Sequence, residues 1–133
     1  MKVLVDTCVV LDVLTKREPF YEDSKRIFTN IAQGKMFGFV TACSINDIYY
    51  LLNKHVHNAS ESKNIISTLI TLFDVLDVNG EDIGNALASN VTDFEDATIV
   101  ESALRHHIDA IVTRNAKDFK AAPIKVFDPS ELM

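Results

Sequence analysis

The sequence predicts an α/β fold, a three-layer α/β/α sandwich around a central, mostly parallel sheet of four to five strands. Short runs of β-branched and other apolar residues are each followed by a longer stretch with helical periodicity. This alternation is typical of parallel strands joined by crossover helices that cover both faces of the sheet. A chain of 133 residues has the size of one ordinary domain, so we expect residues 1–133 to form one.

The predicted strands are short and apolar, as is typical of strands buried on both faces. They are expected at Val3–Val5, Phe37–Val40, Val75–Val78, Ala110–Val112 and Lys125–Phe127. Asn79-Gly80 closes the third strand and Asp128-Pro129 the last, because both dipeptides favour turns.

Between the strands, apolar residues recur at helical spacing. The expected helices are Leu11–Leu14, Ser24–Gln33, Ser44–Asn53, Ile65–Phe73, Glu81–Ala88 and Phe94–His106. We expect Ser44 to cap its helix, and Gly34 to end the helix before it. The polar segment His55–Lys63 is expected to be a loop or a helix break.

Composition narrows the class of protein. The net charge of −6 argues against loose, charge-driven binding of nucleic acid, because such binding depends on Lys and Arg displacing counterions. Cys8 and Cys43 have no metal-ligand spacing and are interpreted as reduced thiols. The N-terminus lacks the pattern of a secretory signal, and no apolar run approaches the roughly 18 residues of a membrane span. We therefore expect a cytoplasmic protein without membrane contact.

Four aspartates follow strand-like runs or begin helices, namely Asp6, Asp47, Asp96 and Asp118. The carboxyl ends of parallel strands share one edge of a sheet, and Asp47 and Asp96, both expected in first helical turns, would lie beside that edge. Two unit charges about 4 Å apart repel by roughly 4 kcal/mol at an effective dielectric of 20. A divalent cation removes this repulsion, and oxygen ligands suit Mg²⁺ or Mn²⁺. The sequence therefore predicts a hydrolytic metal site.

Each aspartate alone also has a purely structural explanation. Asp47 fits a capping box, and Asp93 and Asp96 suit the positive end of a helix dipole. Capping gives no reason, however, for all four acids to gather on one edge. Of the other acids, Glu95 is expected to cap its helix, and Asp12 to lie at the surface or behind the site.

Four polar residues are expected to support these carboxylates. Thr113 ends a buried strand and Asn115 lies in the turn after it, where both can orient acids by hydrogen bonds. Thr7 beside Asp6, and Asp93 at the helix start, are expected to act in the same way. Ordinary turn and capping chemistry remains the alternative for each.

Four segments together carry a resemblance to a known family. They are Val5–Asp12, Thr41–Asp47, Asp93–Ala97 and Ala110–Phe119. The first contains only a weak D-T signal, whereas D-F-E-D-A followed by T-R-N-x-x-D-F is quite specific. The chain resembles, over essentially its whole length, the PIN-domain ribonucleases, in particular the VapC-like toxins of bacterial and archaeal toxin–antitoxin pairs.

The resemblance implies a PIN-like fold, metal-dependent endoribonuclease activity, homodimers and inhibition by a cognate antitoxin. By this resemblance Asp6, Asp96 and Asp118 are ligands of Mg²⁺ or Mn²⁺, and Asp47 takes the place of an acid that is often Glu. Cys8 stands where Asn is usual. A water activated by the metal would then attack the RNA phosphodiester.

Contacts to RNA are expected from Arg114 and Lys117 near the site, with ordinary surface charge as the alternative. An acidic pocket also suits an arginine-bearing antitoxin tail, because guanidinium–carboxylate pairs are strong.

Three other functions are alternatives to a nuclease. A receiver-type phosphoacceptor needs adjacent acids on its first strand, and a haloacid-dehalogenase-like phosphatase needs an Asp-x-Asp that Asp6-Thr7-Cys8 lacks. The more serious alternative is a non-catalytic PIN-like module that binds RNA or protein. The presence of four acids argues against it, whereas Asp at position 47 leaves it open.

Overall fold

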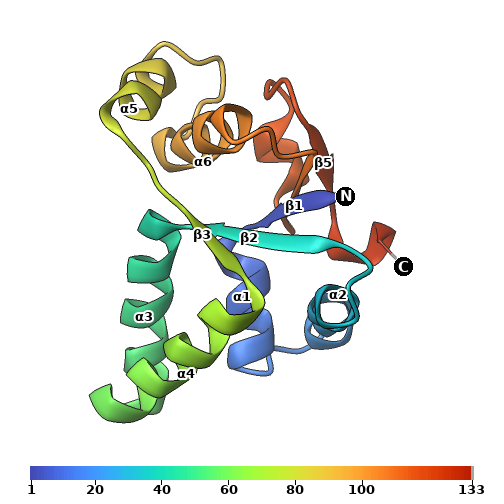
Figure 1. The fold of residues 1–133 in the computed structure, drawn as a ribbon, viewed down its shortest axis with the longest axis vertical. Helices are drawn as coiled ribbons and strands as arrows, with labels where there is room; N and C mark the ends of the chain where they lie inside the picture. The colour runs from blue at the N-terminus through green and yellow to red at the C-terminus, as the bar shows by residue number, and fades with distance from the viewer. Residues whose placement is uncertain (133) are drawn as a thin grey trace.

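The computed structural model describes residues 1–132, which contain a five-stranded sheet in the order β3-β2-β1-β4-β5 (Figure 1). Every neighbouring pair is parallel. The strands are β1 (Lys2–Val5), β2 (Phe37–Thr41), β3 (Asp74–Leu76), β4 (Ala110–Val112) and β5 (Lys125–Phe127). The predicted α/β fold is confirmed, with five strands and an entirely parallel sheet. The last two strands have their predicted bounds, and β3 lies slightly earlier than expected.

The described residues form six α-helices and two short 3₁₀ helices. They are α1 (Thr7–Leu14), α2 (Tyr21–Ala32), α3 (Ala42–Val56), α4 (Ala59–Leu72), α5 (Gly80–Leu87), α6 (Phe94–Arg105), η1 (Ala116–Phe119) and η2 (Pro129–Glu131). None of the helices within residues 1–132 combines the length and the apolar character required to cross a bilayer.

The alternation of side chains along β1 builds a core on each face of the sheet. Val3 and Val5 pack against the layer that contains α1 to α4. Leu4, between them, faces the opposite layer of α5 and α6, together with Ile111 of β4. Figure 1 shows the two helical layers on either side of the sheet. The three-layer architecture predicted from the alternating strands and helices is therefore confirmed.

Of the helices that begin earlier than predicted, two do so because of caps formed by residues at strand ends. The first begins at Thr7 instead of Leu11, since the Asp6 side chain accepts a hydrogen bond from the Thr7 N–H and caps α1. The N-cap of α3 is Thr41, whose Oγ1 accepts from the Ser44 N–H at 3.1 Å, so the prediction that Ser44 is the cap was wrong. The strand-to-helix junctions are thus tight, which brings side chains at the strand ends close to the helix starts.

The segment His55–Lys63 contains the predicted helix break, but it is otherwise helical and forms no long loop. Only His57 and Asn58 separate α3 from α4. His57 adopts a left-handed conformation with φ of 59° and ends α3, while the Asn58 side chain caps α4 by accepting from the Glu61 N–H. The polar sequence marks exposed helix ends, which hydropathy alone does not separate from a loop.

Candidate active site

Asp6 lies where β1 ends and α1 begins, and its carboxylate is only 8% exposed. One oxygen, Oδ1, accepts from the Thr7 N–H at 2.8 Å, and Oδ2 accepts from the Thr113 hydroxyl at 2.8 Å. Thr113 directly follows β4, the neighbour of β1, and is fully buried. Its Oγ1 in turn accepts from the Asn115 N–H at 3.1 Å. This network fixes the orientation of the Asp6 carboxylate.

Thr7 and Cys8, the two residues after Asp6, have side chains that differ in their contacts. The Thr7 hydroxyl is buried and has no hydrogen-bond partner among the described residues. The Cys8 Sγ lies 3.7 Å from Asp6 Oδ2 and 3.8 Å from Thr113 Oγ1. Burial raises the pKa of the Cys8 thiol, and the Asp6 charge raises it further. Cys8 is therefore present as a thiol that donates toward Asp6.

The start of α6 supplies further acids. Asp93 is the N-cap, and its Oδ2 accepts from the Asp96 N–H at 2.9 Å. Asp96, in the first turn of α6, has a pKa raised to about 7, first by burial and then by the charges of Asp6, Asp93, Asp118 and Glu95. Carboxylates from three separate segments thus act on one another, because an acid is harder to ionise beside other anions.

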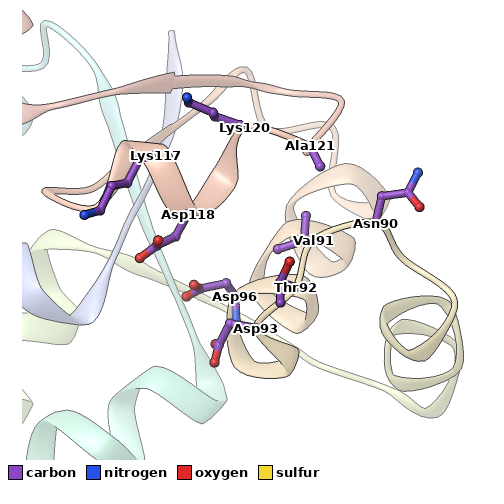
Figure 2. A pocket seen from close by; sticks show the side chains of 9 residues that line it. All are labelled: Asn90, Val91, Thr92, Asp93, Asp96, Lys117, Asp118, Lys120 and Ala121. Carbon is purple, nitrogen blue, oxygen red and sulfur yellow. The ribbon is translucent and has the colours of Figure 1, made fainter.

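Asp118 lies on η1 and lines a pocket with Asp96, as Figure 2 shows. Their carboxylates and that of Asp93 are turned to the same side. The pocket has a volume of about 650 Å³ and is lined by Asn90, Val91, Thr92, Asp93, Asp96, Lys117, Asp118, Lys120 and Ala121. Lys117 and Lys120 add positive charge to a wall that is otherwise acidic. Within residues 1–132, neither lysine forms an ion pair.

Asp47 lies in the second turn of α3, not in the first as predicted, and is exposed. Its carboxyl group shares a hydrogen bond with Glu95, which is the largest of the causes that raise the pKa of Glu95. Glu95 is thus part of the acidic cluster, and the prediction that it caps the helix was wrong, since Asp93 is the cap. Its position directly before Asp96 was the signal in the sequence that placed it near the site.

The candidate ligands of a divalent cation are the carboxylates of Asp6, Asp96 and Asp118. No three His, Cys, Asp or Glu side chains among residues 1–132 converge closely enough to hold one ion. Asp6, Asp93, Asp118 and Glu95 still act on the pKa of Asp96, because Coulomb forces reach further than metal–oxygen bonds. The oxygens of Asp6, Asp96 and Asp118 are nevertheless the ligand type that Mg²⁺ and Mn²⁺ prefer. The chemistry of these residues fits such an ion.

Arg114 and Asp12 form an ion pair. Asp12 is fully buried, which excludes the surface position and leaves the expected position behind the site. Arg114 binds it with two hydrogen bonds, from Nε to Oδ2 at 2.6 Å and from Nη2 to Oδ1 at 3.1 Å. The guanidinium carbon lies 3.9 Å from the centre of the Phe20 ring. Arg114 therefore has partners inside the protein, in place of the predicted contact to RNA.

The fold and the acidic pocket agree with the match to a protein family. The model of the PIN domain matches residues 2–117. This chain belongs to the PIN-domain family, and the resemblance inferred from the sequence motifs is confirmed at that level. Among curated proteins, no sequence matches the chain.

Solved structures of toxins and their complexes have the same fold. A toxin–antitoxin complex from Klebsiella pneumoniae is 20% identical, with 96% of this chain and 97% of that chain covered and a TM-score of 0.70. FitAcB from Neisseria gonorrhoeae is 18% identical over 98% and 99%, with a TM-score of 0.72. VapC20 of Mycobacterium tuberculosis, a sarcin–ricin loop cleaving toxin, is 16% identical over 92% and 98%, with a TM-score of 0.68. Identities this low establish the shared fold.

Proposed function

We propose that this PIN domain is a metal-dependent endoribonuclease that hydrolyses RNA phosphodiester bonds, with Asp6, Asp96 and Asp118 as the ligands of Mg²⁺ or Mn²⁺. The observation that carries the proposal is the pKa of Asp96, which burial and then the neighbouring acids raise to about 7. A fold that keeps several acids together without a basic partner gains stability when a cation binds. When bound, the ion would activate water and neutralise charge on the phosphate.

The chain's own residues hold and orient the reacting groups. Thr113 and the Thr7 N–H keep the Asp6 oxygens in place, which is the role of polar groups behind a metal ligand. Asp47 is one methylene shorter than the Glu common at its position, and in our proposal it acts through its hydrogen bond with Glu95. Asp47 and Glu95 together form a second group of acids beside Asp96.

Recognition of RNA is assigned to Lys117 and Lys120. Both line the pocket beside Asp118 (Figure 2), where their ammonium groups can bind the phosphates that flank the scissile bond. The acidic chain offers few such cations, so we expect a defined RNA loop or single strand instead of indiscriminate binding. The toxin VapC20, which has a similar fold, cleaves the sarcin–ricin loop, and this supports RNA as the substrate class.

We further propose that the chain is the toxin of a toxin–antitoxin pair, acts in the cytoplasm and forms homodimers. The similar fold of the toxin in the Klebsiella pneumoniae complex supports the antitoxin partner. An arginine of that partner would find Asp93, Asp96 and Asp118 in one pocket and could displace the metal by charge-assisted pairing. Light scattering on the purified protein, alone and with the protein encoded beside it, tests both assemblies.

The central test compares the wild type with Asp96→Asn on total bacterial RNA, with Mn²⁺ and with EDTA. Removal of one ligand is expected to lower cleavage about 100-fold or more, at the upper end of the effects seen for groups around a metal. EDTA should abolish the wild-type activity. Asp74→Asn, an exposed change on β3, is the control and should cleave as the wild type does.

The alternative is a non-catalytic PIN-like module, and one result would favour it. In that case wild type and Asp96→Asn would retain RNA equally on a filter, and neither would cut it with Mn²⁺ present. That outcome refutes the nuclease and leaves the binding module.

A further inference from the structure

A buried ion pair beside the acidic pocket, between Asp12 and Arg114, has no part in the hydrolysis proposed above. The Asp12 side chain has no solvent exposure, and Arg114 is its closest partner through the two bonds at 2.6 and 3.1 Å. Ser24 Oγ adds a hydrogen bond at 3.2 Å, and Arg17 Nη1 lies 3.8 Å away. A buried carboxylate is tolerated only when its charge is matched in this way. Arg114 is thus required where it lies.

Arg114 and the residue before it, Thr113, both contact α1. The Thr113 Oγ1 lies 3.8 Å from Cys8 Sγ, and the Arg114 side chain binds Asp12. Cys8 and Asp12 are four residues apart and therefore lie on one face of the helix. Just before them, Asp6 accepts the Thr113 hydroxyl. A line of three contacts thus joins α1 to the turn after β4.

The same turn leads to the other end of the pocket. The Asn115 N–H donates to Thr113 Oγ1 at 3.1 Å, and the Asn115 carbonyl accepts from the Asp118 N–H at 2.9 Å. Thr113 is fully buried and Phe20 covers the Arg114 guanidinium, so the turn has little freedom. Any shift of Arg114 would move the hydroxyl that orients Asp6 and the carbonyl from which the turn of Asp118 begins.

We propose that Arg114 is a positioning residue, which through its pair with Asp12 sets the distance between the Asp6 and Asp118 carboxylates. The inference rests on the proposed nuclease function and specifies how that site is assembled. It replaces the contact to RNA predicted from the sequence, because Nε and Nη2 already bind Asp12 and the Arg114 side chain is only 19% exposed.

The two roles predict different kinetics. A residue that contacts RNA equally in the ground and transition states raises KM when it is removed and leaves kcat unchanged. A residue that positions metal ligands lowers metal affinity and kcat, typically about 10- to 100-fold, with KM for RNA within about twofold. The readouts are Mn²⁺ affinity by electron paramagnetic resonance, and kcat and KM on a short RNA that contains the strongest site cut in total RNA.

The molecule contains a matched control for Arg114→Gln. Arg105 binds the buried Asp82 with the same fork, from Nε and Nη2 at 2.9 Å each. It lies nine residues along α6 from Asp96, about 13 Å along the helix axis. Both Arg114→Gln and Arg105→Gln leave a buried carboxylate unpaired and should lower Tm. Only Arg114→Gln should lower Mn²⁺ affinity and kcat, and equal values in the two variants would overturn the proposal.

A second variant keeps the test valid if Arg114→Gln fails to fold. The double change Asp12→Leu with Arg114→Met removes both charges, a replacement that is often neutral for stability. We expect a Tm close to that of the wild type together with the reduced Mn²⁺ affinity. Wild-type affinity and kcat in this double variant would contradict positioning by the ion pair, as would a raised KM at unchanged kcat in Arg114→Gln.

Failure of the inference can be told apart from failure of the proposed function. A wild-type protein that binds no Mn²⁺ and cuts no RNA refutes the nuclease, and the positioning role falls with it. An active wild type beside an equally active Arg114→Gln refutes the positioning role alone.

Discussion

Two groups of acids in this protein have opposite electrostatic surroundings. At the far end of α6, Arg105 binds Asp77 and Asp82, and this pairing is the main reason that the pKa values of both carboxyls are lowered. At the near end, burial and four neighbouring acids raise the pKa of Asp96 to about 7. The first arrangement stabilises the fold. The second opposes ionisation of Asp96, and a bound cation, as in the proposed function, would remove that cost.

Asp12 shows that the difference is not a matter of distance from the pocket. It lies on the helix that Asp6 caps, yet its charge is matched by Arg114 and, more weakly, by Arg17. Arg114 and Arg17 therefore neutralise Asp12, whereas Asp6 and Asp96 form no ion pair among the described residues. Removal of charge should consequently have opposite effects at the two kinds of site.

The largest expected difference between the two groups concerns metal binding. At a concentration about 1,000 times its Kd, Mn²⁺ should stabilise the wild type by about 4 kcal/mol, a rise in Tm of roughly 15 °C. The reason is that an ion neutralises acids that repel one another in the folded protein. Calorimetry of the wild type and of Asp96→Asn at pH 8 measures the effect, which should largely disappear in the variant. An equal rise in both proteins would show that the ion binds elsewhere.

The paired acids should respond in the opposite sense when their partner is removed. Arg105→Gln leaves Asp82 buried without its cation and should lower Tm by roughly 5–8 °C. Thermal unfolding at pH 7 by circular dichroism measures this. Arg26→Gln, which removes the exposed pair with Asp23, is the control and should change Tm by at most about 1–2 °C. A drop of that small size in Arg105→Gln would mean that the pair contributes little.

The smallest expected effect is a gain in stability on removal of a charge from the pocket. The folded pKa of Asp96, about 7, lies above its ordinary value of 3.8, so the folded protein loses stability as pH rises through that interval. In the absence of metal, Asp96→Asn should be more stable than the wild type by about 1–2 kcal/mol at pH 8, since solvent screens a partly buried group. The two should be equal at pH 4. Urea unfolding at both pH values measures this, and a destabilised variant at pH 8 would contradict the electrostatic interpretation.

Much of the architecture followed from local sequence patterns. The strands Ala110–Val112 and Lys125–Phe127 have their predicted bounds because each is a short apolar run between clear turn signals. The parallel order of the sheet follows from helices between successive strands. Since parallel strands share one edge, the acids after β1 and β4 could be expected on the same side.

Local patterns were less informative where one residue type serves two purposes. The polar stretch after Lys54 was expected to be a loop or a helix break, and it is a break at His57 and Asn58 with helix on either side, because exposed helical turns are as polar as loops. Ser44 and Thr41 are both good caps, and the end of β2 decides between them. Glu95 has a place in the first turn of α6 that suits a cap, yet its carboxyl group meets Asp47 from another helix.

The sequence by itself determined the three-layer α/β fold, the PIN-domain family and which acids follow strands. Only the tertiary structure decided which charges are matched. Asp12 and Arg114 are 102 positions apart, and so no periodicity links them. Burial then makes the difference, because an acid in a low-dielectric interior is stabilised by one guanidinium and destabilised by another carboxylate. Which of the two neighbours an acid has depends on side chains from distant segments. It separates the acids that are paired with arginine from those that lie beside other acids, where we propose that a cation binds.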